Sequence, residues 1–357
     1  MSLSMEPAPT SSQWDRRITM SAYSKNLIAG GIAGCMGKTA TAPLARLTVL
    51  YQVSSLLSKS RDSTIFKISR ADSVFVSMRK LVEKNGVLSL WNGNMAAVMH
   101  RFPYSATNFA VFEACNRYLR ERTGQDSSLN RFISGSAAGS IACAFCYPLD
   151  LLRTRLIVAN SYAAGEQVGS KLYNLVRQIV TNEGVAGLYR GLSASLLVTT
   201  PTLAISFTCY GSIKQQLTNY GGYFATVDAE GGEGQAKLSL FGSLCAGCLS
   251  GSVAATTVYP MDVVRKRMQV MGQLSYTDTG ALGTDAADEA AEQAMRRMQS
   301  STLHHLKTIL RTEGVAGMYR GLTPELLKVC PMVALMYGSY EIVQQNLDAF
   351  FPTSSNH

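Results

Sequence analysis

The chain repeats one pattern of motifs three times, and this repetition constrains its fold more than any other feature of the sequence. Each repeat contains an aromatic residue two positions before a glycine, at Trp91 and Gly93, Tyr189 and Gly191, and Tyr319 and Gly321. A proline follows each of these glycines after ten residues, and an aromatic residue follows after nineteen. A fixed period of this kind indicates that one structural unit occurs three times and that the units pack together.

A second shared element precedes the first in every repeat and is built around a proline. It reads PLARLT from Pro43, PLDLLR from Pro148 and PMDVVR from Pro260, and two glycines one helical turn apart precede each proline. Glycines at this spacing let helix backbones approach closely inside a membrane. A proline is tolerated there because neighbouring helices bond the freed carbonyl group. We therefore expect Pro43, Pro148 and Pro260 to mark kinks in three membrane helices.

The composition agrees with a protein that faces lipid. Charged residues make up 16% of the chain, whereas a soluble domain carries about 25%. We predict an all-α membrane fold in which six transmembrane helices form three pseudo-symmetric repeats, each with a short amphipathic helix between its two membrane helices. The six helices are expected near 24–52, 95–120, 129–158, 192–218, 238–270 and 322–347, and the short helices near 72–84, 170–182 and 301–313.

The same pattern sets the expected domain boundaries. The repeats occupy 24–122, 129–219 and 237–347, with a polar N-terminal segment at 1–23, a linker at 220–236 and a tail at 348–357. Residues 275–300 lengthen the third repeat, and we expect solvated loops there and in the glycine-rich linker. The alternative is a soluble solenoid, but solenoid repeats span about 20–45 residues and are much shorter than these.

Residues that often indicate enzymes or metal sites have a simpler interpretation here. Cys143 and Cys146, like Cys245 and Cys248, lie in stretches of small apolar residues without a nearby histidine. We interpret both pairs as helix-packing positions. The sequence shows no nucleophile–base pair, metal cluster or phosphate-cradling loop, so we predict neither an enzyme nor a cofactor. The net charge of +9 is not gathered into one run, which argues against nucleic acid as a partner.

The proline motifs follow the pattern P-x-[DE]-x-x-[KR] in full at Pro148 and Pro260 and without its charges at Pro43, and each precedes an E-G…[WY]-[KR]-G element that reads N-G…W-N-G in the first repeat. Three such motifs in register resemble the mitochondrial carrier family across residues 24–347. The resemblance implies a threefold pseudo-symmetric bundle around a water-filled cavity that opens alternately to the two sides. It also implies a multi-pass protein of the mitochondrial inner membrane with both termini in the intermembrane space; some relatives reside in plastids or peroxisomes. The stretch from Gly30 to Pro43 is similar to the first helix of adenine nucleotide carriers. The stretch from Pro260 to Gln269 lacks the Arg-Arg-Arg-Met-Met-Met run of ADP/ATP carriers.

The resemblance places the main substrate contacts seven residues after each terminal glycine, near the middle of the membrane. The residues at and beside these positions are His100, Arg101, Val198, Thr199 and Lys328. Lys38 lies five residues before Pro43, where the other two repeats have Cys143 and Ala255. Lys38 therefore breaks the threefold symmetry, as a contact to an asymmetric ligand should.

The charges at these positions predict a polyanionic ligand. A cation in the middle of a membrane costs at least ~2.5–3.5 kcal/mol and persists where it faces a polar cavity. Lys38, Arg101 and Lys328 favour a di- or triphosphate, and we expect Val198 and Thr199 to receive the flat face of a base or a pantetheine arm. The alternatives are snorkelling of the two lysines, pairing of Arg101 with another helix, and packing of His100 as a hydrogen-bonded residue.

In the family, the proline motifs close the matrix side through a ring of ion pairs that glutamines brace. The matching residues of this chain are Gln52, Asp150, Arg153, Asp262, Arg265 and Gln269. Ala45 and Thr48 remove both charges from the first repeat, so only Asp150 and Arg265 remain a matched pair.

The opposite, cytoplasmic gate of the family uses the pattern [FY]-[DE]-x-x-[KR] near the ends of the even-numbered helices. This chain supplies Glu113, Tyr210, Lys214, Tyr340 and Glu341 at those positions. Only Lys214 and Glu341 form a matched pair. We expect both gates to be weak and balanced, because a strong gate on one side would bias the equilibrium between the two states.

From these residues and the resemblance we expect an exchanger of phosphorylated nucleotides, namely adenine nucleotides, coenzyme A or both. A carrier of thiamine pyrophosphate or another diphosphate is the alternative within the same class. A non-transporting scaffold or a proton-leak protein is the alternative from another class. The expected partners are a phosphorylated small molecule and the lipid bilayer, with an anionic lipid such as cardiolipin on the matrix side. We expect a monomer, because one chain holds all three repeats.

Overall fold

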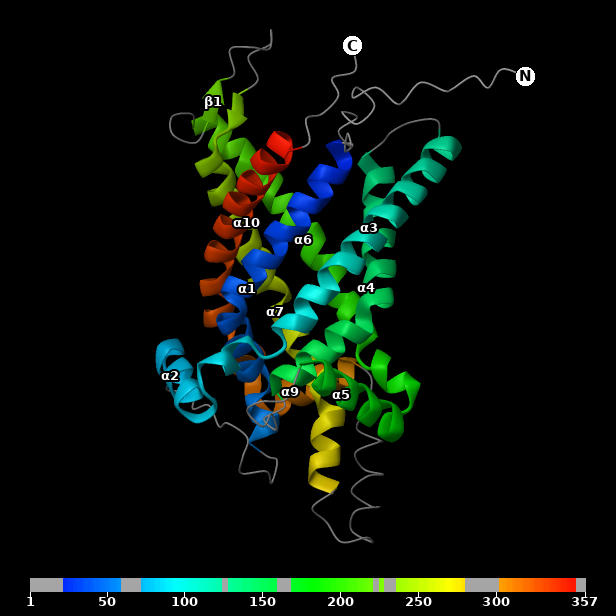
Figure 1. The fold of residues 1–357 in the computed structure, drawn as a ribbon, viewed down its shortest axis with the longest axis vertical. Coiled ribbons are helices and arrows are strands. Elements are labelled where there is room, and N and C mark those ends of the chain that lie inside the picture. Colours follow the sequence, from blue (N-terminus) through cyan, green and yellow to red (C-terminus); the bar gives the residue numbers. More distant parts are fainter. Residues whose placement is uncertain are drawn as a thin grey trace, which may run out of the picture.

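A computed structural model describes residues 22–58, 72–123, 128–158, 168–220, 225–227, 236–279 and 302–350. Long helices that run between the two ends of the molecule dominate it (Figure 1). In chain order they are α1 (Ala22–Leu57), α3 (Asn94–Thr123), α4 (Ser128–Val158), α6 (Leu192–Tyr220), α7 (Leu240–Thr279) and α10 (Leu322–Phe350). The predicted all-α fold is confirmed, and most of the predicted spans are extended by a few residues.

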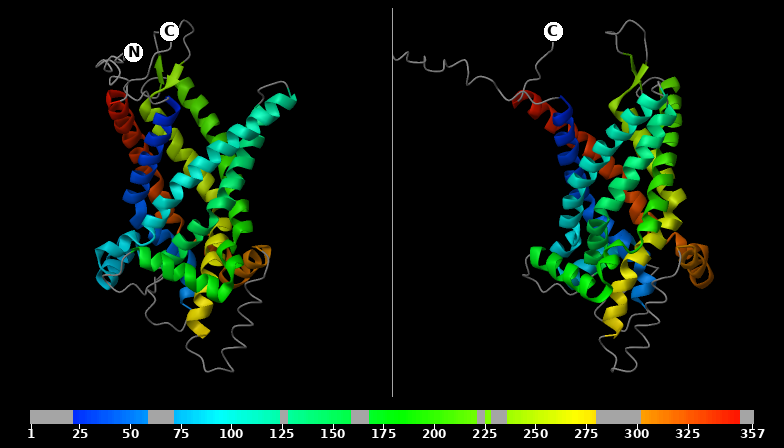
Figure 2. Two further views of the ribbon diagram at one scale, coloured as in Figure 1. Left: turned by 45° about the vertical axis from the view of Figure 1, so that its right-hand side comes forward. Right: turned by 90° about the vertical axis from the view of Figure 1, so that its right-hand side faces the viewer.

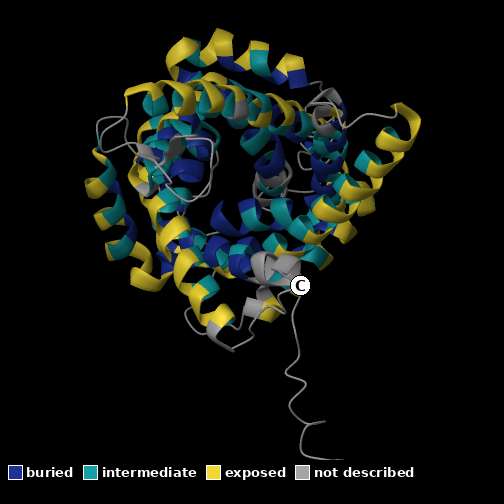
Figure 3. Ribbon diagram, turned by 90° about the horizontal axis from the view of Figure 1, so that it is seen from above, coloured by how far each residue is buried: buried dark blue, intermediate teal, exposed yellow. Residues whose placement is uncertain are grey.

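The long helices form a closed ring. α1 packs against α3, α3 against α4, α4 against α6, α6 against α7, α7 against α10, and α10 against α1. Because α10 ends the third repeat and α1 begins the first, the contact between them closes the ring. Figure 3 shows exposed residues on the outside of this ring and buried residues nearer its centre. Large apolar side chains such as Phe145, which is 66% exposed, suit an outer face covered by lipid.

Each repeat also carries a short helix at the end of the ring opposite the start of α1 and the end of α10 (Figure 1). These helices are α2 (Val74–Asn85), α5 (Val168–Glu183) and α9 (Thr302–Met318). The 3₁₀ turns η2 (Val87–Trp91) and η3 (Val185–Tyr189) follow α2 and α5. Ser73 caps α2 by accepting a hydrogen bond from the Val76 N–H, which satisfies a backbone donor that the helix leaves unpaired. We call this the matrix end of the ring, and the opposite end the intermembrane end, as the resemblance implies.

The glycines that end the repeated motif have a structural cause. Gly93, Gly191 and Gly321 have φ angles of 82°, 81° and 88°, a left-handed conformation that favours glycine. They also touch neighbouring helices, because an added Cβ would lie 2.9 Å from the Arg153 carbonyl oxygen at Gly93 and 3.0 Å from Tyr147 Oη at Gly191. The chain therefore needs glycine to turn into the second long helix of each repeat.

The apolar core lies around the short helices at the matrix end. Three buried clusters join each short helix to the long helices beside it. Leu81 anchors α2 in the first cluster, Ile179 anchors α5 in the second and Ile309 anchors α9 in the third. This core holds the matrix ends of the long helices together, where the gate residues lie.

Two expectations about loops need correction. In the linker, β1 (Ala225–Val227) pairs antiparallel with β2 (Ala236–Leu238), and the β-branched Thr226 and Val227 favour this extended conformation. α7 continues to Thr279, beyond the expected end at 270, because no proline interrupts residues 271–279. The rest of these two segments, residues 221–224, 228–235 and 280–300, lies outside the described residues.

By length and hydropathy alone, three helical stretches of the described chain are apolar enough to cross a membrane. They are Val185–Tyr220, Phe241–Met271 and Leu322–Asp348. The other long helices, α1, α3 and α4, carry charged residues such as Lys38, Arg101 and Asp150, which lower their hydropathy. Pro43, Pro148 and Pro260 lie inside α1, α4 and α7, and each helix continues past its proline. Kinks at these prolines stay a prediction.

Candidate functional site

An ion pair between two proline motifs connects the long helices at the matrix end. α1, α4 and α7 contact one another across the ring. Arg265 of α7 donates a hydrogen bond to Asp150 of α4, with an Nη2–Oδ2 distance of 2.6 Å, and the two side chains are 16% and 13% exposed. The contact expected from the sequence is therefore present, and it ties the second repeat to the third.

Two buried glutamines brace the carboxylates of this gate. Gln269 donates to Asp150 at 2.9 Å, and Gln52 donates to Asp262 at 2.8 Å. Both glutamine side chains are buried. Lys266 donates to the Oε1 atom of Gln269 at 3.2 Å, so both ends of this amide are bonded. A buried network of this kind fixes the position of the carboxylate that it holds.

The neutral residues of the first repeat leave a gap in the gate. Ala45 and Thr48 line a cavity of about 140 Å³ at this position. Thr48 donates to the carbonyl of Leu44 in its own helix at 3.0 Å, and its side chain forms no hydrogen bond to another of the described helices. The matrix gate therefore consists of the pair between Asp150 and Arg265 and the bond between Gln52 and Asp262.

The sequence pattern offers no counter-charge for Arg153, and the structure shows its charged neighbours. Arg153 lines the same cavity as Asp262, Lys266, Glu325 and Lys328. Asp150, Glu325 and Asp262 supply the negative charge that acts on it. No described residue forms a hydrogen bond or an ion pair with Arg153. Its guanidinium is therefore available to bind a ligand or to pair with another gate residue in a different conformation.

Lys328 already has a partner in this structure. Its Nζ atom lies 2.7 Å from Oε2 of Glu325, one helical turn earlier in α10, and the two side chains are 16% and 23% exposed. The family motifs do not point to Glu325, although acidic and basic residues three positions apart in a helix are themselves a signal for pairing. Lys266 is also outside the motif, although it follows Arg265 directly. A phosphate that binds Lys328 has to compete with Glu325.

Lys38 and Arg101 lie on adjoining helices without a partner. The Arg101 guanidinium lies against α1 so closely that a Cβ added to Gly34 would be 2.8 Å from its Nε atom. Lys38 follows Gly34 by one helical turn and therefore lies on the same face of α1. Arg101 Nε is buried without a hydrogen bond, and neither cation forms an ion pair with another described residue. Burying unpaired cations is costly unless an anion joins them.

The remaining substrate positions contribute differently. His100 stacks on Tyr104 with ring centroids 5.3 Å apart, so packing holds its ring. Val198 is 8% exposed and offers little surface to a ligand. Thr199 donates to the Ser195 carbonyl at 2.8 Å, which leaves its oxygen as an acceptor.

The structure does not bring the residues of the intermembrane gate together. Glu113, Lys214 and Glu341 are exposed, and Tyr210 and Tyr340 are half-buried. No ion pair joins Lys214 to Glu341 in the described part of the chain. Figure 2 shows the helix ends spread apart at this end of the ring. The pairing of Lys214 with Glu341 stays a prediction for another conformation.

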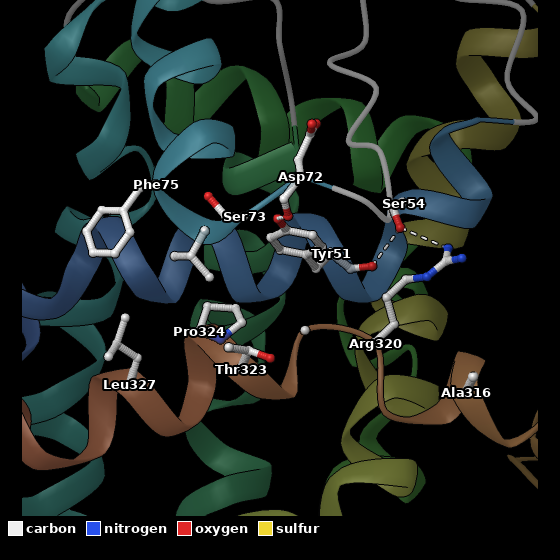
Figure 4. Close-up of a pocket in the computed structure, with 12 residues that line it drawn as sticks. Tyr51, Ser54, Asp72, Ser73, Phe75, Ala316, Arg320, Thr323, Pro324 and Leu327 are labelled. Atoms are coloured by element: carbon white, nitrogen blue, oxygen red, sulfur yellow. Dashed lines mark hydrogen bonds between the residues drawn. The ribbon is translucent and has the colours of Figure 1, made fainter.

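A separate cavity lies at the matrix end between the first and third repeats (Figure 4). Its volume is about 560 Å³, and residues of α1, the start of α2 and the start of α10 line it. Ser54 of α1 accepts a hydrogen bond from Arg320 at 3.0 Å. Phe75 and Leu327 are exposed apolar side chains at its edge. The N-terminus of a helix attracts anions, and two helix starts border this cavity.

The interior of the ring has an excess of positive charge. The cations are Lys38, Arg101, Arg153, Arg265, Lys266 and Lys328, and the carboxylates are Asp150, Asp262 and Glu325. No group of three or more metal-ligating His, Cys, Asp or Glu side chains occurs among the residues that the structure describes. A closed ring of long helices with a cationic interior and a gate at its matrix end defines a multi-pass membrane carrier.

The chain belongs to the mitochondrial carrier protein family, whose sequence model matches residues 20–123, 124–221 and 236–349. It is 33% identical to mitochondrial substrate carrier family protein P of Dictyostelium discoideum, over 88% of this chain and 92% of that protein. It is 32% identical to the mitochondrial adenyl nucleotide antiporter SLC25A24 of Mus musculus over 90% of this chain, and it spans 58% of that protein. It is 30% identical to the mitochondrial adenine nucleotide transporter ADNT1 of Arabidopsis thaliana, over 92% of this chain and 89% of that protein.

Proposed function

We propose that the chain exchanges adenine nucleotides across the mitochondrial inner membrane by alternating access. The observation that carries the proposal is the pair of neighbouring cations, Lys38 and Arg101, neither of which has a hydrogen-bond or ion-pair partner among the residues that the structure describes. Phosphate oxygens fit these cations because hydrogen bonds between charged groups are strong. Two of the relatives carry adenine nucleotides by name, which supports a nucleotide over other anions. Coenzyme A contains an adenosine phosphate and belongs in the same test.

In the proposed cycle, the substrate enters from the intermembrane end while Asp150 and Arg265 keep the matrix end closed. Its phosphates bind Lys38 and Arg101 and then compete with Glu325 for Lys328. A ligand shifts an equilibrium between two states only by its difference in affinity for them. New contacts to the cations beside the gate supply that difference, so the occupied protein changes state more readily than the empty one. Exchange of one substrate for another follows.

Uptake into liposomes tests this proposal. Liposomes that contain the purified protein and internal ATP should take up labelled ATP, and liposomes without internal nucleotide should not. Replacing both cations, Lys38→Ala with Arg101→Ala, should reduce uptake roughly a hundredfold, since hydrogen bonds to charged groups contribute about 1.5–3 kcal/mol each. The matched control is Arg117→Ala, an exposed arginine on the same helix as Arg101, which should keep wild-type uptake.

The same liposomes separate the alternatives. Uptake of thiamine pyrophosphate or coenzyme A in place of ATP would keep the transport function and change its substrate. The absence of any uptake would favour a scaffold or a proton-leak protein. Wild-type ATP uptake by the double variant would contradict the role of Lys38 and Arg101.

We also propose that the cavity in Figure 4 holds the headgroup of an anionic lipid such as cardiolipin. Helix starts and Arg320 would favour phosphate, and the exposed Phe75 and Leu327 would contact acyl chains. Cardiolipin should raise the midpoint of thermal unfolding in detergent more for the wild type than for Thr323→Trp, which fills the cavity from an exposed position. Phosphatidylcholine is the control lipid, and an equal rise in both proteins would count against this site.

A further inference from the structure

A third cavity lies in the half of the ring nearer the intermembrane end, between α3, α4 and α6. Its volume is about 630 Å³, which is within the range of about 300–1,000 Å³ that binds small molecules. α3 lines it with Tyr104, Asn108 and two phenylalanines, α4 with glycines and serines, and α6 mainly with threonines. We call this cavity the recess.

The recess faces the interior of the ring. Tyr104, Asn108 and Phe112 follow Arg101 at spacings of three, four and four residues, which places all four side chains on one face of α3. The lipid-facing side of α3 is marked by exposed residues such as Met99, at 45%. On α4, Gly139 of the recess is about 200° around the helix from the exposed Ile141, at 100° per residue. A ligand of the central site can therefore reach the recess.

The recess continues directly into the cationic site. The ring of Tyr104 stacks on His100, and Arg101 lies one turn away from Tyr104 on the same face of α3. From Arg101 to Asn108 the helix rises about 10 Å, at 1.5 Å per residue. A nucleotide that places its phosphates on Lys38 and Arg101 extends over this distance toward its base.

The recess offers unused hydrogen-bonding groups beside aromatic rings. The side chains of Asn108, Ser136 and Ser140 make no hydrogen bond to a described residue, whereas Thr199 and Thr208 donate to carbonyls of their own helix. An asparagine amide provides a donor and an acceptor side by side. Adenine presents the matching acceptor and donor at N7 and N6, whereas guanine presents two acceptors at the equivalent atoms. Aromatic side chains also provide surfaces on which a base can stack.

We propose that the recess binds the base and sugar of the transported nucleotide and that Asn108 selects adenine. The inference rests on the proposed function and adds the part of the site that binds and selects the base. Tyr104 and Phe112 contact the base, Asn108 bonds its edge, and Lys38 and Arg101 bind the phosphates. The base thus lies between α3, α4 and α6, rather than against Val198, which is buried and does not line the recess.

Competition during ATP exchange tests the proposal. Unlabelled ATP, GTP and tripolyphosphate, which has no base, compete with labelled ATP for uptake into ATP-loaded liposomes. Wild-type protein should bind ATP about tenfold more tightly than GTP, at the lower end of the discrimination that a bidentate contact provides. Asn108→Ala should abolish this preference and leave the inhibition constant of tripolyphosphate within about twofold of its wild-type value.

A second variant fills the recess. A Cβ added to Gly135 meets no atom within 4 Å, so the side chain of Gly135→Leu enters open space and should weaken ATP inhibition about tenfold while sparing tripolyphosphate. The matched control is Gly338→Leu on α10, where an added Cβ also meets no atom within 4 Å; it should keep both constants.

The outcomes separate the two levels of the proposal. If the wild type exchanges no nucleotide, the proposed function is wrong, and the recess cannot be the base subsite of a transported nucleotide. If the wild type exchanges ATP but Asn108→Ala and Gly135→Leu keep its constants, transport stands and the recess is not the base subsite. Equal weakening of ATP and tripolyphosphate in both variants would likewise overturn the inference, because the loss would then concern the phosphates.

Discussion

A single residue outside the family motifs, Glu325, holds Lys328, which is one of the proposed substrate contacts. Its carboxylate holds Lys328 at 2.7 Å while the matrix gate is closed, so a phosphate that binds Lys328 has to displace it. Glu325→Gln removes this competitor and should lower the KM for ATP about threefold, as expected if this partly exposed pair contributes up to about 1 kcal/mol. Initial rates of ATP uptake over a range of external ATP measure the KM. Lys328→Met should raise it, and an increased KM for Glu325→Gln would refute the competition.

The short helices of the second and third repeats are fastened by a carboxylate between two arginines. Glu183 at the end of α5 pairs with Arg155 of α4 and, at 2.5 Å, with Arg190. Glu313 of α9 is likewise bonded to Arg267 of α7 at 2.5 Å and lies 3.6 Å from Arg320. The first repeat has Asn85 at the equivalent position and packs α2 through its apolar cluster. The three short helices therefore lie at equivalent places in their repeats, but α5 and α9 are held by ion pairs and α2 by apolar packing.

Loss of such a carboxylate should destabilise the bundle. The side chains of Glu183 and Arg155 are 2% and 1% exposed, and removal of one partner from a buried pair costs roughly 3–5 kcal/mol. Glu183→Gln should lower the midpoint of thermal unfolding in detergent clearly. Glu83→Gln is the control, because Glu83 and its partner Arg79 are 60% and 82% exposed, and such pairs contribute about 0–1 kcal/mol. Equal unfolding midpoints for the two variants would argue against the view that the pair of Glu183 and Arg155 holds α5 in place.

The corresponding carboxylate of α9 gives a prediction for pH. Burial tends to raise the pKa of Glu313, but the hydrogen bonds and the charge of Arg267 outweigh it and hold the pKa below its ordinary value of 4.5. A lowered pKa in the folded state contributes stability that is present above pH 4.5 and is lost as the pH falls through the folded-state pKa. Unfolding midpoints of the wild type and Glu313→Gln should therefore differ at pH 7 and converge in acid. A constant difference down to pH 3 would contradict this linkage.

The sequence predicts the positions of the helices better than it predicts the contacts at the candidate site. The repeated glycines mark backbone conformations that few other residues adopt, so the motifs locate the long and short helices. Asp150 and Arg265 were predictable because both stand at fixed distances from a proline. The Glu325 pair and the recess around Asn108 were missed, because they lie outside the motifs and depend on neighbouring helices. The β1–β2 hairpin and the end of α7 were missed because the linkers carry no periodic pattern.

At the scale of the whole molecule, the structure is closed at one end and spread at the other. Asp150 and Arg265 are paired at the matrix end, while Lys214 and Glu341 are exposed and form no ion pair with each other in the described part of the chain, and the helix ends are spread apart at the intermembrane end (Figure 2). If Lys214 and Glu341 pair in the other state, one ion pair at each end would keep the two states close in free energy, whereas a change of about 5.5 kcal/mol shifts a two-state equilibrium from 1:99 to 99:1. Transport by alternating access then requires that the pairs form in turn.

A charge swap tests whether the intermembrane pair forms during transport. Lys214→Glu and Glu341→Lys should each slow ATP exchange up to about tenfold, because each places like charges together in the closed intermembrane gate and costs about 1 kcal/mol or slightly more. The two changes together should restore the rate, since the swapped charges attract again. The control is Lys214→Glu with Glu113→Lys, which reverses the same two kinds of charge. Glu113 is not matched to Lys214 in the cyclic order of the repeats, so this control should not restore exchange. Equal recovery in both double variants, or none in either, would show that Lys214 and Glu341 do not close this end of the ring.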